Sequence, residues 1–243
     1  MILNESRVLI RTEKLSKSYK LGNEMKVAVR EVDIKIVQGE FVIIEGLRGL
    51  QKNVFVNLMG CLERPTVGKY YFDYEDIALA KEGILDDIRK LKLGYLFRDF
   101  NLIARLTAAQ NIEVLLQGLN ISQAEKRDRL QKTLKRFDIE SIAEKKVSEL
   151  TDYQKQLVSL ARAVVNSPLM IIADEPAANL NSKEEKELME HLLRLNSEGI
   201  AIMLITENTE LKASNRFRLI SFQDGRISED KEVQKLSLVR REA

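Results

Sequence analysis

The chain has 243 residues, 44% of them apolar, which is enough to bury the core of one large domain or two small lobes. Its 39 basic and 37 acidic residues nearly cancel, so the net charge of +2 gives no long-range reason to expect a nucleic acid or a membrane surface as partner. No apolar run approaches the roughly 18 residues that cross a bilayer, and the N-terminus MILNESRVLIRTEK has charges where a signal peptide needs an apolar stretch, so we expect a cytoplasmic protein.

Two residue types that often carry chemistry occur once each. The single cysteine, Cys61, excludes an internal disulfide, and its apolar neighbours favour a buried structural thiol over a reactive one. The single histidine, His191, lies in the helical stretch KEEKELMEHLLRLN with no second imidazole to share a metal, so we do not expect it to be a ligand.

The first third of the chain predicts short strands: RVLIRTEKL, VREVDIKIVQ with alternating apolar positions, and the buried run FVII. A loop, EGLRGLQKNVF, and a helix-like stretch, VNLMGCLE, follow, and after the turn signal PTVG comes the aromatic strand GKYYFDYEDI. From about residue 84 to residue 165 helical patterning dominates, as in SQAEKRDRLQKTLKRFDI.

Strand patterns return in LMIIADE at 169–175 and in IAIMLITE at 200–207, separated by the helix that contains His191. Strand, helix and strand in this order imply a parallel sheet with crossover helices. Since no linker rich in Pro, Gly or Ser divides the chain, we expect a single domain over 1–243 with an inserted helical lobe at about 98–165.

The segment EGLRGLQKNVF, residues 45–55, lies between a strand and a helix, where a phosphate-binding loop is expected. Gly46 and Lys52 stand at the separation of the pattern G-x-x-x-x-G-K-[ST], but Gln51 occupies the second glycine position and Asn53 the Ser/Thr position. Alone this partial match is weak evidence for a nucleotide site, because a glycine and a lysine at this spacing often occur by chance.

Paired acids end the run LMIIADEP, at the C-terminal end of a predicted buried strand, where open α/β sheets bind ligands. In this pattern Asp174 is a predicted Mg²⁺ ligand and Glu175 a predicted general base that polarises an attacking water. A strand that simply ends in solvated acids is the alternative.

From about residue 6 to residue 228 the chain resembles the ATP-binding subunits of ABC transporters. EGLRGLQKNVFVNLMGCLERPTVGKYYFDYEDI resembles their Walker A loop with its helix and next strand, and LGYLFRDFNLIARLTAAQNIEV resembles the Q-loop segment that faces the membrane subunit. ELTDYQKQLVSLARAVVNSPLMIIADEPAANLNS resembles the signature motif, Walker B and D-loop in their usual order. RPTVG, FNLIARLTAAQN and EPAANLNS most resemble the group that serves lipoprotein release, macrolide-type export and the cell-division permease.

The resemblance implies an ABC-type P-loop α/β fold: an antiparallel β lobe, a RecA-like parallel-sheet core and an inserted helical lobe. It also implies sites for ATP and Mg²⁺. The nucleotide-binding positions are Tyr19, Gly46, Gly49, Lys52, Asp174, Thr151 and Gln154. The metal positions are Asp174 and Asn53, and the catalytic positions are Glu175 and Glu207, the latter in place of the switch histidine. For Tyr19, stacking on adenine and a surface strand tyrosine are equal alternatives.

Five motifs depart from the family pattern. Gln51 removes a glycine's backbone freedom and adds a side chain where phosphates approach. Asn53 offers Mg²⁺ only an amide oxygen on a longer arm, and Arg98 replaces the Q-loop glutamine with a fixed cation that opposes Mg²⁺ but can pair with phosphate. The D-loop aspartate is Asn181, a milder change.

The signature motif reads Leu-Thr-Asp-Tyr-Gln over 150–154, so Asp152 and Tyr153 replace two glycines. Glu207 places an anion where the family has a donor to the γ-phosphate. A carboxylate about 4 Å from a phosphate charge costs roughly 4 kcal/mol at an effective dielectric near 20, or nearly three decades of affinity. Arg98 or Arg48 would offset part of this cost.

In the head-to-tail dimer that the resemblance implies, each site joins one chain's Walker A loop to the other's signature motif, so neither site would be standard. We therefore favour a degenerate, non-hydrolysing or weakly hydrolysing subunit with a structural or regulatory role. It docks on a permease through the segment around Leu93–Val114, at the inner face of the membrane, beside a second copy or a related subunit. The alternatives are a working ATPase that powers export or lipoprotein extraction and a soluble interaction protein without a permease.

Overall fold

The structure is a computed structural model that describes residues 7–22, 24–208, 211–212 and 216–232. Residues 1–6, which hold part of the N-terminal segment discussed above, lie outside the described residues. No helix in the described part of the chain is long and apolar enough to cross a membrane.

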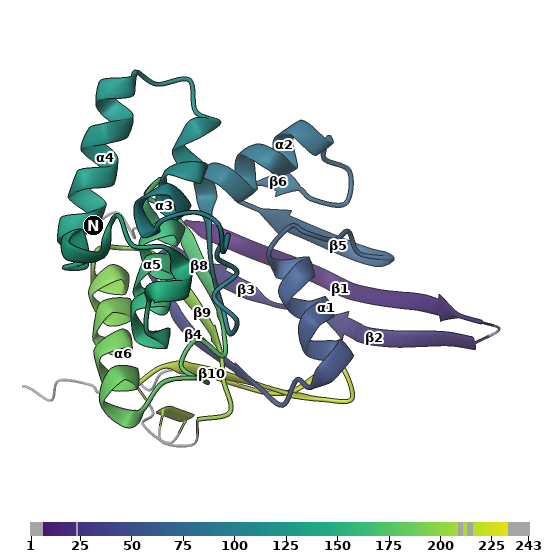
Figure 1. The fold of residues 1–243 in the computed structure, drawn as a ribbon. Coiled ribbons are helices and arrows are strands. Elements are labelled where there is room, and N and C mark those ends of the chain that lie inside the picture. Colours follow the sequence, from purple (N-terminus) through teal and green to yellow (C-terminus); the bar gives the residue numbers. More distant parts are fainter. Residues whose placement is uncertain (1–6, 23, 209–210, 213–215, 233–243) are drawn as a thin grey trace, which may run out of the picture.

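An antiparallel sheet forms the first lobe, on the right of Figure 1. Its strands follow the order β2-β1-β5-β6, and β3 pairs with β1. The bounds are β1 Val8–Leu21, β2 Glu24–Val32, β3 Lys35–Val37, β5 Val67–Phe72 and β6 Glu75–Asp76. The predicted strand VREVDIKIVQ is in fact two strands. The buried hydroxyl of Thr12 donates to Val32 O and accepts from Ile34 N, both at 2.8 Å, and holds the break between them.

The second sheet has the order β11-β10-β4-β9-β8-β7, parallel except for the β10–β11 hairpin. Its strands are β4 Phe41–Glu45, β7 Leu93–Phe97, β8 Met170–Asp174, β9 Ala201–Ile205, β10 Arg218–Gln223 and β11 Arg226–Lys231. β4, β8 and β9 are continuous apolar runs, as expected for parallel strands covered on both faces. Periodicity alone does not predict β7, because its five residues lie inside a stretch of helical pattern.

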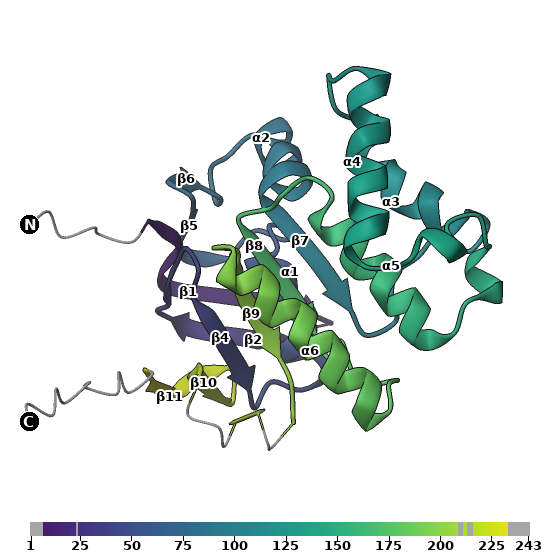
Figure 2. The same ribbon diagram turned by 90° about the vertical axis from the view of Figure 1, so that its left-hand side faces the viewer.

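Helices cover both faces of this parallel sheet. The α-helices are α1 Gly49–Met59, α2 Glu82–Asp87, α3 Ala108–Gln117, α4 Gln123–Arg136, α5 Asp152–Val164 and α6 Ser182–Ser197. The shorter turns are a π-helix at Ile88–Lys92 and 3₁₀ turns at Glu140–Ile142 and Val147–Glu149. In Figure 2, α6 crosses one face of the sheet and α1 lies behind it.

Two hydrophobic clusters use the two faces of the parallel sheet. One joins α1 to the antiparallel lobe and includes Phe55, Tyr70 and Phe72. The other joins the sheet to α3, α5 and α6 and includes Ile112, Leu160 and Leu192. This arrangement is the predicted architecture: an antiparallel lobe, a parallel-sheet core and a helical lobe. It leaves α1 between the two sheets, with its N-terminus at the C-terminal end of β4.

Candidate functional site

Three parallel strands end side by side at one edge of the core sheet. Ile44 of β4 and Asp174 of β8 both pair with Ile205 of β9. Backbone hydrogen bonds extend the pairing past the strand ends, from Thr206 N to Ile44 O at 3.1 Å and from Glu175 N to Ile205 O at 2.9 Å. The loops after β4, β8 and β9 therefore start together, where open α/β sheets bind ligands.

The loop after β4 turns at a glycine that tolerates no side chain. Gly46 has a φ of 78°, and a Cβ built there would lie 2.1 Å from Phe222 O. Gly49, with a φ of 50°, then begins α1, whose N-cap residue Arg48 makes no side-chain capping hydrogen bond and whose first turn holds no acidic residue. The partial positive charge of this helix end is therefore left for an anion, as in phosphate-binding loops.

Gln51 changes this loop through its side chain and not through its backbone. It lies in the first turn of α1 and is not among the described residues with positive φ, so the backbone here does not need a glycine's left-handed conformation. Its amide nitrogen lies beside Gly225 in the β10–β11 turn.

The retained lysine is paired with the first acid of β8. Lys52 Nζ lies 2.8 Å from Asp174 Oδ1, and both side chains are largely buried. At this distance the ammonium of Lys52 is the partner of Asp174 Oδ1, which accepts no further hydrogen bond among the described residues. A carboxylate is the ligand type that Mg²⁺ takes, so Asp174 at the end of β8 fits the metal, with the exposed Asn53 one residue beyond Lys52.

Glu175 follows in a left-handed conformation, with a φ of 46°. Burial raises the pKa of Glu175, Lys52 acts against this, and the negative charges of Asp174 and Glu207 raise the pKa further. The switch position therefore adds an anion to a place that already holds two carboxylates, although the exposed side chain of Glu207 also lies 3.5 Å from Lys212 Nζ.

Lys212 links the switch position to the start of the phosphate loop. Its Nζ lies 2.8 Å from Glu45 Oε2, and Ser221 Oγ donates to Glu45 Oε1 at 2.6 Å. Glu45 immediately precedes Gly46. Sequence reasoning missed this cluster, and the only available signal was a carboxylate that ends the otherwise apolar strand FVIIE.

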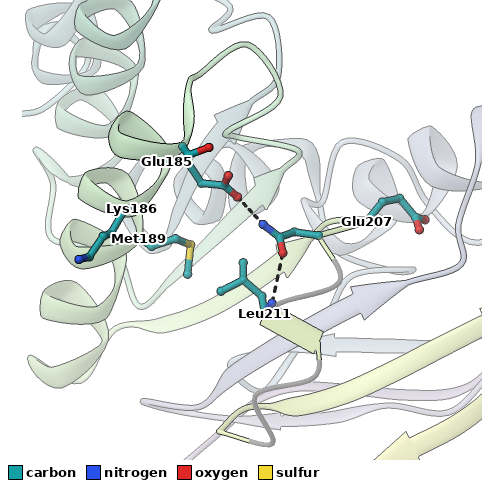
Figure 3. Close-up of a pocket in the computed structure, with 7 residues that line it drawn as sticks. Glu185, Lys186, Met189, Glu207 and Leu211 are labelled. Carbon is teal, nitrogen blue, oxygen red and sulfur yellow. Dashed lines mark hydrogen bonds between the residues drawn. The ribbon is translucent and has the colours of Figure 1, made fainter.

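A hollow of about 610 Å³ lies beyond Glu207, between α6 and the segment after β9. Asn208 Nδ2 donates to Glu185 Oε1 at 2.6 Å, and Leu211 N donates to Asn208 Oδ1 at 3.2 Å. Figure 3 shows Glu185 and Met189 on the α6 side of the hollow and Glu207 pointing away from them. Glu207 is therefore directed away from α6.

The signature-like residues form the start of α5. Thr151 Oγ1 accepts from Gln154 N at 3.2 Å, and Gln154 Oε1 accepts from Thr151 N at 3.1 Å, so the two side chains cap the helix. Asp152 pairs with Lys155 at 2.9 Å. Tyr153 is half-buried; burial raises the pKa of Tyr153, and its hydrogen bond to Glu187 on α6 raises it further. Among the described residues, no hydrogen bond or ion pair joins 150–154 to the phosphate loop of the same chain.

Tyr19 lies on β1, where its hydroxyl donates to Glu63 and Lys17 Nζ lies 5.3 Å from the ring centroid. Glu63 follows the C-terminal end of α1, whereas the phosphate loop precedes its N-terminal end. The hydroxyl is therefore fixed at the far end of the helix, and the stacking of this ring on adenine stays a prediction.

Next to β7 lies a cavity of about 350 Å³ between the core sheet and the helical lobe, here called the docking groove. Its lining residues are Asp86, Arg89, Lys90, Leu93, Gly94, Tyr95, Phe97, Asn101, Val114, Leu115, Arg162 and Ala163. The predicted permease-facing segment Leu93–Val114 contributes much of this lining. Arg162 of α5 donates to Phe100 O at 2.9 Å and to Asn101 O at 2.6 Å, which fixes the loop after β7. Sequence reasoning missed Arg89 and Arg162, since neither matches a chemical motif.

Arg98, at the glutamine position of the Q-loop, comes directly after β7 and is exposed. Its carbonyl oxygen accepts from Asn179 Nδ2 at 3.1 Å, which ties it to the segment between β8 and α6. Asn181, at the D-loop position, is the N-cap of α6 and accepts from Lys183 N and Glu184 N, each at 3.0 Å. These two departures therefore lie on loops that contact the ends of neighbouring elements.

Comparison with known proteins identifies the family. The family model described as ABC transporter matches residues 29–178. YknY of Bacillus subtilis, an uncharacterized ABC transporter ATP-binding protein, is 36% identical over 219 residues, which cover 90% of this chain and 95% of YknY. Macrolide export ATP-binding/permease protein MacB 2 of Aeromonas hydrophila is 35% identical over 225 residues, 93% of this chain but only 35% of MacB 2.

The fold gives the same result. The dimeric structure of the ABC transporter cassette MJ0796 of Methanocaldococcus jannaschii superposes with a TM-score of 0.84 at 34% identity, covering 93% of this chain and 99% of that one. A second dimeric structure of MJ0796, in a post-hydrolysis state bound to ADP and Pi, also has a TM-score of 0.84, at 33% identity. With its sheet edge, uncapped loop helix and paired acids in place, the chain is an ATP-binding, nucleotide-binding domain of the ABC transporter family.

Proposed function

We propose that this nucleotide-binding domain docks on the cytoplasmic side of an ABC permease and acts there as a structural or regulatory subunit with little or no hydrolysis of its own. The observation that carries the proposal is the charge at the site. Asp174 and Glu175 are carboxylates that a working site also needs, and Glu207 adds a third where the family pattern has a donor to the γ-phosphate. Efficient hydrolysis instead requires cations or hydrogen-bond donors at this position, because negative charge develops on the phosphoryl oxygens in the transition state.

The size of the penalty is limited by solvent. Glu207 is exposed and Lys212 lies nearby, so its repulsion of a phosphate is smaller than the roughly 4 kcal/mol of an unscreened pair at 4 Å. ATP and Mg²⁺ binding therefore remains compatible with Lys52, Asp174 and the uncapped start of α1. In the proposed mechanism these groups hold phosphate and metal, while Gln51 and Asn53 weaken the fit.

The signature-like residues support the same conclusion for the second half of a shared site. In a head-to-tail dimer the start of α5 would face the phosphates of the other chain. Thr151 and Gln154 bond to each other there, and Asp152 brings a carboxylate that Lys155 only partly neutralises. Both halves are thus altered in a homodimer, and each composite site has one altered half when a related subunit is the partner.

The docking groove supports association with a permease. Tyr95, Phe97 and Val114 give it an apolar lining, and Arg89, Lys90 and Arg162 outnumber its one acid, Asp86. A short amphipathic cytoplasmic segment of a permease with an acidic side chain fits this chemistry. We place the chain at the inner face of the cell membrane on this basis, and we propose that 1–243 act as one domain with a helical lobe at about 98–165.

Phosphate release by the detergent-purified complex tests the proposal. We expect the parent and its Glu175→Gln variant to release phosphate at the same low rate, because Glu175 is not supporting turnover. A parent rate well above background that Glu175→Gln abolishes would overturn the proposal in favour of the second candidate, a working ATPase, which we propose would power export or lipoprotein extraction. That candidate is favoured by one observation, the ion pair of Asp174 with the retained Lys52, next to Glu175.

A further inference from the structure

The C-terminal end of α1 is held by side chains from other elements. Three consecutive carbonyl oxygens each accept a hydrogen bond: Met59 O from Tyr70 Oη at 2.6 Å, Gly60 O from Tyr95 Oη, and Cys61 O from Arg89 Nη1 at 2.9 Å. α1 has no basic residue in its last turn, so Arg89 supplies the positive charge that a helix C-terminus favours.

Two of these three donors also line the docking groove. Arg89 belongs to the π-helix at Ile88–Lys92, a strained form that is often found at functional sites. The same guanidinium bonds to Glu82 at 2.7 Å and to Asp86, so its position depends on the groove wall. Tyr95 lies on β7, with its ring stacked on Phe97 at a centroid distance of 5.8 Å.

The contact between the groove wall and α1 is too close to absorb movement. A Cβ at Gly60 would lie 2.7 Å from the Tyr95 ring, so the ring lies directly against the backbone of the helix end. α1 has 11 residues, which makes it a rod of about 16 Å. Its other end carries the phosphate loop and Lys52. A displacement of Tyr95 or Arg89 would therefore move α1 as a rigid unit, together with the phosphate loop at its N-terminal end.

We propose that Arg89 and Tyr95 are positioning residues through which a segment that occupies the docking groove shifts α1 and changes the phosphate loop. The route runs from the π-helix and β7 into the helix C-terminus and does not pass through Arg98. This inference rests on the proposed docking and extends it, since it states how a segment bound in the groove changes the conformation of the nucleotide site.

The test uses an artificial occupant of the groove. Val114, which is 41% exposed and lines the groove, is replaced by cysteine and labelled with N-cyclohexylmaleimide. Cys61 stays unlabelled because burial raises the pKa of its thiol to about 12. The chain contains no tryptophan, so Leu50→Trp, in the first turn of α1, gives a single fluorescent reporter close to Lys52 in the chain.

We expect labelling to shift the emission maximum of this tryptophan reporter in the parent and in Lys90→Met, which removes a groove cation without touching α1. The shift should be lost in Arg89→Met and reduced in Tyr95→Phe, which removes the hydrogen bond to Gly60 O but keeps the ring against the helix end. Thermal unfolding of the unlabelled variants separates a positioning role of Arg89 and Tyr95 from a merely structural one. A variant that is less stable but keeps the labelling response contradicts the proposal.

An unshifted parent, or equal shifts in all four proteins, would overturn the inference. The isolated full chain is used throughout and no permease is present. Failure of docking is measured separately by co-purification, so the two proposals can fail independently.

Discussion

At the residue scale, the site depends on a few side chains in unusual surroundings. The structure brings Gly46, Lys52, Asp174, Glu175 and Glu207 to one sheet edge. The strand patterns before them predict that their loops start at one edge of a parallel sheet, and the resemblance to ABC transporter subunits implies that these residues share a site. The cluster of Lys212, Glu45 and Ser221 could not be predicted, since it joins three segments that share no motif.

The two glycines of the phosphate loop should differ in what they tolerate. Gly46→Ala forces a Cβ to 2.1 Å from Phe222 O and should cost about 3 kcal/mol of unfolding free energy. At Gly49 a Cβ meets open space, so Gly49→Ala should cost only about 1 kcal/mol, from its positive φ. Urea unfolding measures both, and equal losses would contradict the structure.

Removing the charge at the switch position should strengthen nucleotide binding. Glu207→Gln takes one of three carboxylates from the site, and we expect about a tenfold tighter Kd for ATP with Mg²⁺ in calorimetric titration, given the screening at this exposed position. Glu190→Gln, on the exposed side of α6, removes the same charge elsewhere and should have no effect. Similar changes in the two variants would show that only net charge matters.

The raised pKa of Glu175 gives a pH dependence. The folded state binds this proton more tightly than the unfolded state, so the ionised carboxylate destabilises the fold once the pH exceeds the unfolded pKa. The unfolding free energy of Glu175→Gln, minus that of the parent, should therefore rise as the pH increases from below the unfolded pKa to neutrality. A difference that stays constant across this range would rule out the shift.

At the element scale, the capping hydrogen bonds at the ends of α5 and α1 fix side chains of the candidate site and of the docking groove. The capping box of α5 holds Thr151 and Gln154, and the carbonyls at the end of α1 hold Arg89 and Tyr95. The sequence motifs do not predict these contacts. The sequence predicts α4 and α6 to within a few residues because both are long and periodic. It does not predict β7, where tertiary pairing with β8 outweighs the local helical pattern.

Thr151 should be a structural cap as well as a motif residue. Thr151→Ala removes the acceptor for Gln154 N and should cost about 1 kcal/mol of stability, whereas Thr151→Ser keeps a hydroxyl and should cost little. Urea midpoints compare the three proteins. If alanine and serine behave alike, the cap contributes nothing to stability.

At the scale of the whole molecule, the groove between the core sheet and the helical lobe is the expected contact with a permease. Val114→Glu places a carboxylate in its apolar part and should abolish co-purification with detergent-solubilised membrane partners. Leu79→Glu changes a side chain that is 82% exposed and outside the groove, and should leave co-purification intact. Retention of both variants would argue against docking here.

The order of strands in the parallel sheet has a consequence for synthesis. β4 pairs with β9 on one side and β10 on the other, so its backbone hydrogen-bonding edges have no neighbouring strand until most of the chain has been made. At about 5–20 residues per second this wait lasts roughly 10–30 s on the ribosome. We therefore expect the nascent chain to need chaperone protection over this interval. A folded intermediate that no longer needs the chaperone should appear only once β9 has left the exit tunnel.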